Sequence, residues 1–162
     1  MSNVSDSALF EQTVRSPEDM DALASTLAPH LRSGDVFLLN GNLGAGKTKF
    51  VQGVARALGF QEDVTSPTFT ILISYHTGSL PINHFDLYRL EDSEELTDIG
   101  YWDVLEDEGI AFIEWGDKFP DDEPYDFVEM TITVAEDGVR TVRLVPRGQR
   151  AQELVHAWSS SA

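Results

Sequence analysis

The sequence predicts an α/β fold with one mixed β-sheet flanked by helices. Three observations predict it. Apolar runs of strand length alternate with helical patterns, a glycine-rich loop joins one such run to a helix, and two runs flank an Asp-Gly turn. The chain has 162 residues, 41% of them hydrophobic, which is enough to bury one core. We therefore expect a single compact domain over 1–162, with flexible ends at 1–7 and 159–162.

The N-terminal part of the chain predicts two strands and two helices. A short strand pattern covers 9–14, and a serine followed by proline marks the start of a helix expected over 16–32. The apolar run at 36–39 predicts a buried strand in front of the glycine-rich loop. Helical spacing at 49–58 predicts a helix directly behind that loop.

The remaining elements are predicted from apolar alternation and helical spacing. Strands are expected at 69–75, 80–85, 109–114, 127–134 and 139–145, and helices at 93–100, 101–107 and 151–158. The last two strands flank the Asp-Gly turn and are predicted to form a β-hairpin.

A phosphate-binding loop, called the P-loop below, is predicted at residues 41–48. The pattern G-x-x-x-x-G-K-[ST] is matched at every fixed position by the residues Gly41, Asn42, Leu43, Gly44, Ala45, Gly46, Lys47 and Thr48. Glycines let backbone N–H groups approach phosphate oxygens, Lys47 can reach the outer phosphates, and Thr48 offers a hydroxyl to Mg²⁺. Two of the three lysines of the chain, Lys47 and Lys49, fall here, and both are predicted to contact nucleotide. The fold is therefore expected to be P-loop NTPase-like.

Two acidic residues follow apolar runs and are candidates for a metal site. Glu114 ends the run 110–113, and Asp86 ends the more mixed run 82–85. A P-loop needs an acid for Mg²⁺, usually at the end of a neighbouring strand. We expect both acids to face the same region, one holding Mg²⁺ and the other positioning the attacking water. The sequence leaves these two roles unassigned.

Polar residues in two further segments are weaker candidates. Ser66 and Thr68 flank a proline in an extended loop, which is typical of a switch loop that senses the γ-phosphate and equally of a plain proline turn. His84 alternates with Asp86, so the two share a face of the strand. His84 could orient an acid or a water molecule, or it could be an ordinary hydrogen-bonded core histidine.

Composition disfavours several classes of function. The net charge of −17 and the lack of a basic stripe disfavour tight, direct nucleic-acid binding, and favour partner proteins with basic surfaces. The chain has no cysteine for disulfides or thiolate metal sites, and no apolar run reaches the ~18 residues of a membrane span. No secretory signal is visible, so we expect a cytoplasmic location. A GTPase is disfavoured because neither N-K-x-D nor D-x-x-G occurs.

Five segments together resemble the TsaE (YjeE) family of small bacterial P-loop ATPases. They are GNLGAGKT at 41–48, TSPTFT at 65–70, HFDLYRLED at 84–92, EELTDIG at 94–100 and IEW at 113–115. HFDLYR after SPTF is far more specific than the P-loop alone. The chain departs from the family pattern at Asn42, at Lys49 and at Gly116-Asp117, and none of these departures removes a core group of the site.

The resemblance implies an ATPase that converts ATP to ADP and phosphate with Mg²⁺. Lys47, Asp86 and Glu114 would be its catalytic residues, and Thr48, Asp86 and Glu114 would lie near the metal. Ser66 and Thr68 would lie in a switch-like loop. The resemblance also implies two partner proteins, TsaB and TsaD, in making N6-threonylcarbamoyladenosine at position 37 of tRNAs that read ANN codons. TsaD would carry out the transfer to tRNA.

Two other functions stay open at this point. ATP could order the switch loop and a partner surface without being hydrolysed, which would make the chain an assembly module. A small-molecule kinase is less favoured, because no arginine-rich lid is evident in the sequence. Since no arginine is securely placed as a finger, hydrolysis is expected to be slow without partners.

Overall fold

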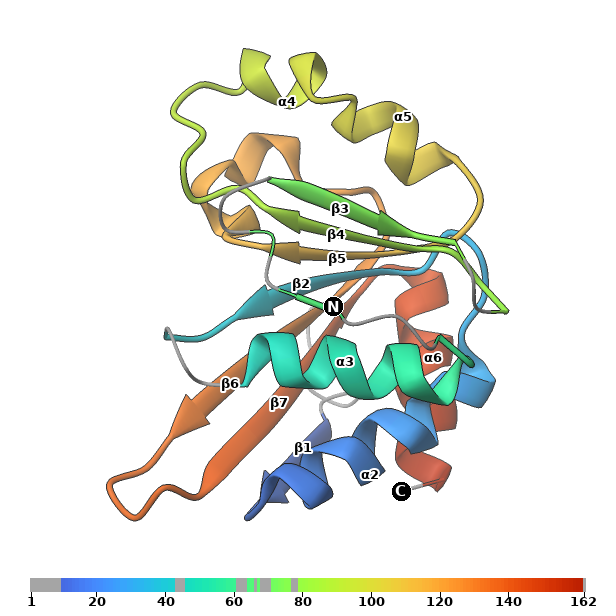
Figure 1. Ribbon diagram of the computed structural model, residues 1–162, viewed down its shortest axis with the longest axis vertical. Coiled ribbons are helices and arrows are strands. Elements are labelled where there is room, and N and C mark those ends of the chain that lie inside the picture. Colours follow the sequence, from blue (N-terminus) through green and yellow to red (C-terminus); the bar gives the residue numbers. More distant parts are fainter. Residues whose placement is uncertain are drawn as a thin grey trace.

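The computed structural model describes residues 10–42, 46–60, 64–65, 67, 71–76 and 79–161. Figure 1 shows one sheet with helices on both faces. The strands are β1 (Phe10–Val14), β2 (Val36–Asn40), β3 (Leu72–Tyr75), β4 (Ile82–Asp86), β5 (Ile110–Glu114), β6 (Phe127–Val134) and β7 (Arg140–Arg147). The α-helices are α2 (Pro17–Leu27), α3 (Lys47–Ala57), α4 (Glu94–Asp98), α5 (Tyr101–Glu106) and α6 (Gln149–Ser161).

The seven strands form one mixed sheet in the order β1-β7-β6-β2-β5-β4-β3. The four central strands β6, β2, β5 and β4 run parallel, so their carboxyl ends meet at one edge. The flanking pairs β1–β7, β6–β7 and β3–β4 are antiparallel. The predicted α/β class with a mixed sheet is confirmed, as are the C-terminal hairpin and the pairing of the two strands after the P-loop helix.

Alternate residues along the central strands enter two separate apolar clusters. On β5, Ile110 and Phe112 join the cluster under α2, α3 and α6, whereas Ala111 and Ile113 join the cluster under α4 and α5. Figure 1 shows α3 and α4–α5 on opposite sides of the sheet. Glu114 is next in this alternation, so its side chain lies on the α3 face. His84 and Asp86 on β4 share that face, because they pair in register with Phe112 and Glu114.

Helix α2 begins as predicted but ends early. Ser16 is its N-cap and accepts a hydrogen bond from the N–H of Asp19 at 3.1 Å. The prediction that the helix continues to Arg32 is wrong, because the α-helix ends at Leu27 and a 3₁₀ turn covers Ala28–His30. Pro29 has no N–H to donate to the carbonyl four residues earlier, so the α-helical bonding stops there.

Several other boundaries differ from the predictions by two or three residues, including the start of β4 at Ile82 and the end of β7 at Arg147. Helix α3 begins at Lys47 rather than Lys49, which places Lys47 in its first turn. Strand β3 begins at Leu72, after Ile71 at φ 70°, and positions 69 and 70 of the predicted strand 69–75 lie outside the described residues. Helix α6 has 13 residues and extends the predicted helix at both ends.

No helix in the described part of the chain is long and apolar enough to cross a membrane.

Helix α3 packs closely on α2 at Gly53. A methyl group added at Gly53 would lie 2.8 Å from Ala24 Cβ and 3.2 Å from Asp21 Oδ1. We expect Gly53→Ala to lower the free energy of unfolding by about 1 kcal/mol. Overpacking costs about 1–3 kcal/mol, and the better helix propensity of alanine returns only about 1 kcal/mol. Urea denaturation measures the difference.

The second half of this test is a compensating change on the facing helix. Ala24→Gly removes the methyl group that Gly53→Ala would meet, so the double variant should lose less stability than the two single changes added together. Strictly additive losses, or a single Gly53→Ala variant more stable than the wild type, would contradict this packing.

Candidate nucleotide-binding site

The P-loop joins the carboxyl end of β2 to the first turn of α3. Gly46 is the residue before the helix, and its φ of 117° lies in the left-handed region that glycine tolerates best. The first turn of α3 contains no acidic residue, so its positive end is not neutralised by a side chain of that turn. Such a helix start is suited to bind phosphate. Leu43, Gly44 and Ala45 lie outside the described residues.

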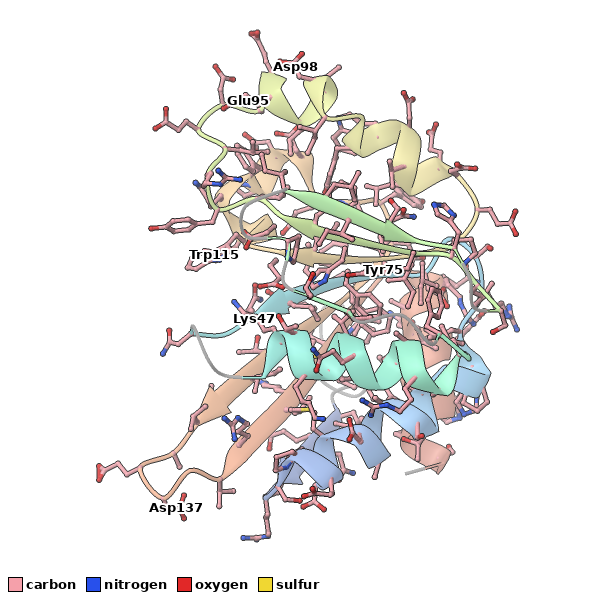
Figure 2. All side chains as sticks on the ribbon, viewed as in Figure 1. Lys47, Tyr75, Glu95, Asp98, Trp115 and Asp137 are labelled. Atoms are coloured by element: carbon pink, nitrogen blue, oxygen red, sulfur yellow. The ribbon has the colours of Figure 1, made fainter. Side chains whose placement is uncertain are left out.

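Lys47 is a buried cation with three neighbours. Its Nζ donates a hydrogen bond to the carbonyl oxygen of Gly41 at 2.9 Å and lies 3.6 Å from Glu114 Oε1. It also lies 5.2 Å from the ring centroid of Trp115. Only 8% of Lys47 is exposed, so these groups replace most of the water around the ammonium. Figure 2 shows Lys47 and Trp115 near one another, beside the carboxyl ends of the central strands.

The two predicted acids lie side by side at the ends of neighbouring strands. Asp86 pairs in register with Glu114, which in turn pairs with Leu39 of β2, and each acid is 5% exposed. Asp86 Oδ1 accepts a hydrogen bond from the N–H of Tyr88 at 3.0 Å, which holds the chain as it leaves β4. The structure thus brings together Lys47, Glu114 and Asp86, as the sequence analysis expected.

His84 joins this group from inside the sheet. The residue is fully buried, and its Nε2 lies 2.6 Å from Glu114 Oε2. Glu114 therefore has one carboxylate oxygen on His84 and the other facing Lys47. The alternation of His84 and Asp86 predicted their shared face, but no sequence pattern indicated that His84 would contact Glu114.

Trp115 bends the chain immediately after Glu114. Its φ of 64° is unusual for a residue with a side chain, and a 3₁₀ turn, Gly116–Lys118, follows. The half-buried ring packs on Tyr88, with centroids 4.9 Å apart. Lys118 holds this edge by hydrogen bonds from Nζ to the carbonyl oxygens of Tyr88 and Leu90.

A small cavity of about 40 Å³ lies beside Lys47. Its lining residues are Leu39, Asn40, Gly41, Lys47, Trp115 and Asp117. This volume suits a water molecule rather than a nucleotide. P-loops bind phosphates mainly through backbone N–H groups of the loop, so a large preformed cavity is not required.

A larger cavity of about 260 Å³ lies at the amino end of β2, away from the P-loop. Two of its charged groups are already paired, because Arg150 donates to both carboxylate oxygens of Asp35 at 2.8 and 2.9 Å. The Asp35 carboxylate raises the pKa of the Arg150 guanidinium above its usual value. This cluster joins β2 to α6, and we assign it to stability rather than chemistry.

The remaining predicted contacts are only partly described. Thr48 is in the first turn of α3 and half-buried, whereas Asn42 is exposed. Lys49 forms an ion pair with Asp21 of α2 at 3.3 Å and is not part of the cluster around Lys47. Ser66 and Thr68 lie outside the described residues.

Two described residues of the predicted switch segment, Thr65 and Pro67, are each held by a hydrogen bond. The N–H of Thr65 donates to the hydroxyl of Tyr75 at 3.1 Å. The carbonyl oxygen of Pro67 accepts a hydrogen bond from the N–H of Ile71 at 2.7 Å.

Arg140 is a residue near the P-loop that sequence reasoning missed. A methyl group added at Gly46 would lie 3.6 Å from Arg140 Nε and 3.3 Å from Met20 Cε, so both side chains pack against the end of the P-loop. Only the pairing of β7 with β1 and β6 brings Arg140 there, and no local motif records that pairing.

The oxygen donors at this site suit Mg²⁺, which also takes phosphate and water oxygens as ligands, better than a metal ion bound by protein side chains alone. Within the ranges that the structure describes, no three His, Cys, Asp or Glu side chains form a metal-binding group. Mg²⁺ is usually bound by one or two carboxylates together with phosphate oxygens and water. The hydroxyl of Thr48 and the carboxylates of Asp86 and Glu114 are oxygen donors of this kind, at the same edge of the sheet.

Comparison with known proteins agrees with this geometry. The family model described as threonylcarbamoyl adenosine biosynthesis protein TsaE matches residues 14–142. The tRNA threonylcarbamoyladenosine biosynthesis protein TsaE of Bacillus subtilis (strain 168) is 38% identical over 138 residues, which cover 85% of this chain and 86% of that protein. The protein of the same name from Treponema pallidum (strain Nichols) is 41% identical over 128 residues, covering 79% and 94% of the two chains.

A solved structure shares the whole architecture. The crystal structure of Bacillus subtilis YdiB superposes with a TM-score of 0.80 at 30% sequence identity, covering 94% of this chain and 95% of that one. The family match spans the P-loop, both strand-end acids and His84. The chain belongs to the TsaE family of P-loop proteins.

Proposed function

We propose that this chain is an Mg²⁺-dependent ATPase that supports formation of N6-threonylcarbamoyladenosine on tRNA. The observation that carries the proposal is the position of Lys47, at the start of α3 and between the Gly41 carbonyl and the Glu114 carboxylate. A buried ammonium at the positive end of a helix favours anions nearby, and the Glu114 carboxylate at 3.6 Å is farther than the ~2.7–2.9 Å of a charge-assisted hydrogen bond. The β- and γ-phosphates of ATP are anions that can bind Lys47 more closely at this position.

Hydrolysis at this site is an in-line attack of water on the γ-phosphorus. The bond from the γ-phosphorus to the bridging oxygen breaks, ADP leaves, and the proton of the water passes to a carboxylate or to solvent. Lys47 and the backbone N–H groups at the start of α3 stabilise the charge that develops on the phosphate oxygens. Either Asp86 or Glu114 accepts a hydrogen bond from the attacking water and holds it in line.

Thr48, Asp86 and Glu114 would hold the metal ion. Mg²⁺ bound there neutralises phosphate charge and aligns the phosphate oxygens. The two carboxylates differ in their surroundings. Glu114 is hydrogen-bonded to His84 and faces Lys47, whereas Asp86 accepts a hydrogen bond from the backbone N–H of Tyr88. This difference supports separate roles, one in holding the metal and one in positioning water.

The transfer to tRNA belongs to a partner in this proposal. The net charge of −17 opposes direct contact with tRNA phosphates, and it favours proteins with basic surfaces. Figure 2 shows the Asp98 carboxylate of α4 pointing outward, and Glu91, Asp92 and Glu94 nearby in the chain are exposed as well. We infer that TsaB and TsaD are these partners, that TsaD modifies position 37 of tRNAs that read ANN codons, and that the chain acts in the cytoplasm.

Reconstitution tests the proposal directly. Purified TsaB and TsaD are incubated with tRNA, an activated threonylcarbamoyl donor, ATP and Mg²⁺, with or without this chain, and modified nucleoside is measured over time. We expect repeated rounds of modification only when the chain, ATP and Mg²⁺ are all present. Equal modification without the chain would overturn the proposed role.

A further inference from the structure

We propose that His84 is a positioning residue that holds the Glu114 carboxylate away from Lys47 and so keeps Lys47 available for phosphate. This inference rests on the proposed function and adds a role for a buried side chain outside the P-loop and the acid pair. The inference rests on three side chains that lie in a row, namely His84, Glu114 and Lys47. His84 Nε2 lies 2.6 Å from Glu114 Oε2, and Glu114 Oε1 lies 3.6 Å from Lys47 Nζ.

The hydrogen bond between His84 and Glu114 has a defined direction. Glu114 faces the ammonium of Lys47, so its carboxylate is ionised and can only accept hydrogen bonds. His84 Nε2 must therefore carry the hydrogen. Among the described residues, Nδ1 of the same ring is buried without a hydrogen-bond partner. The geometry therefore points to Nε2 as the donor in this contact.

The two contacts of Glu114 are unequal. The His84 contact is short and fully buried, whereas the Lys47 contact is longer than an ordinary charge-assisted hydrogen bond of about 2.7–2.9 Å. The carboxylate is thus held by His84 rather than by Lys47. Without the N–H of His84, the Glu114 carboxylate would lack this hydrogen-bond donor and would move toward the Lys47 ammonium. A tight Glu114–Lys47 pair would compete with phosphate for Lys47 and would turn the carboxylate out of its position.

The strand supplies the rigidity that such a role needs. His84 lies in the middle of β4, with Ile73 of β3 on one side and Phe112 of β5 on the other. Its ring has no exposed surface, so it cannot move to solvent when Glu114 changes partners. Outer groups of this kind fix the orientation of ligand carboxylates.

Three variants of the chain test the role. We expect His84→Phe, which keeps a ring but has no donor, to lower kcat for ATP hydrolysis by about 10–100-fold. His84→Gln should recover most of the rate, because its amide nitrogen lies as many bonds from Cα as Nε2 of histidine. The matched control is Ser74→Ala, which removes the 2.7 Å hydrogen bond to Asn83 on the same strand pair but leaves the site intact. The control should retain its rate within about twofold.

Two measurements do not depend on turnover. Mn²⁺, used as a probe for Mg²⁺ in the presence of ADP, should bind about 10-fold or more weakly to His84→Phe, with His84→Gln close to wild type. In the wild-type chain with ¹⁵N-labelled histidine, the His84 resonance should show hydrogen on Nε2. Thermal unfolding of each variant shows whether a lost rate reflects lost structure.

The outcomes separate this inference from the proposed function. If wild-type chain fails to hydrolyse ATP with its partners present, the proposed function fails, while the Mn²⁺ and ¹⁵N measurements still decide the role of His84. A His84→Phe variant with wild-type kcat and Mn²⁺ affinity would overturn the inference. Equal losses in a folded His84→Gln and in His84→Phe would overturn it as well, as would the absence of hydrogen on Nε2.

Discussion

Replacing Lys47 with alanine is expected to lower kcat/KM for ATP hydrolysis by about 10²–10³-fold, the loss typical of removing one group that stabilises the transition state. The effect should appear in both binding and turnover, because Lys47 faces the phosphates before and during the reaction. Nucleotide affinity measured by calorimetry should fall together with the rate. The alanine variant should still fold, since Glu114 keeps its hydrogen bond to His84.

Arg56→Ala is the matched control for this prediction. Arg56 also carries a positive charge on α3, but its side chain is 64% exposed and pairs with Asp21 on the neighbouring helix. Its loss tests whether general charge on the helix, rather than the position of Lys47, attracts nucleotide. We expect the rate and the affinity of this control to stay within about twofold, because exposed ion pairs contribute little. Similar losses in Lys47→Ala and Arg56→Ala would contradict the assigned site.

Replacing Glu114 with glutamine is expected to separate binding from hydrolysis. Glutamine keeps the size of the side chain and can still accept from His84 Nε2, but it removes the negative charge. We expect kcat to fall by about 10²–10⁴-fold, as for loss of a group that handles a proton or positions water. Nucleotide affinity should change by less than about threefold, because Lys47 and the start of α3 remain in place. Glu114→Ala should show the same separation.

Glu129→Gln serves as the control for the charge change. Glu129 lies on β6, on the face opposite to Glu114, and pairs with Arg147 at the surface. Its replacement should leave hydrolysis unchanged within about twofold, as expected for an exposed ion pair. If Glu114→Gln lost affinity as strongly as turnover, its role in hydrolysis would be wrong and a role in binding nucleotide would replace it.

Much of this site could be predicted because its signals are local in sequence. The P-loop is a contiguous pattern, and Asp86 and Glu114 each follow an apolar run. Parallel strands bring their carboxyl ends to one edge, so two strand-end acids were expected to lie together. Their pairing in register agrees with that expectation. The alternation on β4 likewise placed His84 and Asp86 on one face.

The contacts that depend on packing could not be predicted. The distance from Glu114 to Lys47 is set by how α3 lies on the sheet, and the distance from Glu114 to His84 by the side-chain conformations on the neighbouring strands β5 and β4. The position of Arg140 beside Gly46 depends on the pairing of β7 with β1, between segments far apart in the chain. The early end of α2 was a local signal that was missed, because the apolar spacing continued past Pro29.

The most direct test of the account is repeated tRNA modification with Glu114→Gln in the reconstituted system. The account holds that hydrolysis at this site, not ATP binding alone, allows the partners to act more than once. We predict that the variant supports at most one modified tRNA per molecule of chain, whereas the wild-type chain supports many. If the variant drives as many rounds as the wild type while its hydrolysis is lost, the chain is a nucleotide-dependent assembly module and the ATPase account is contradicted.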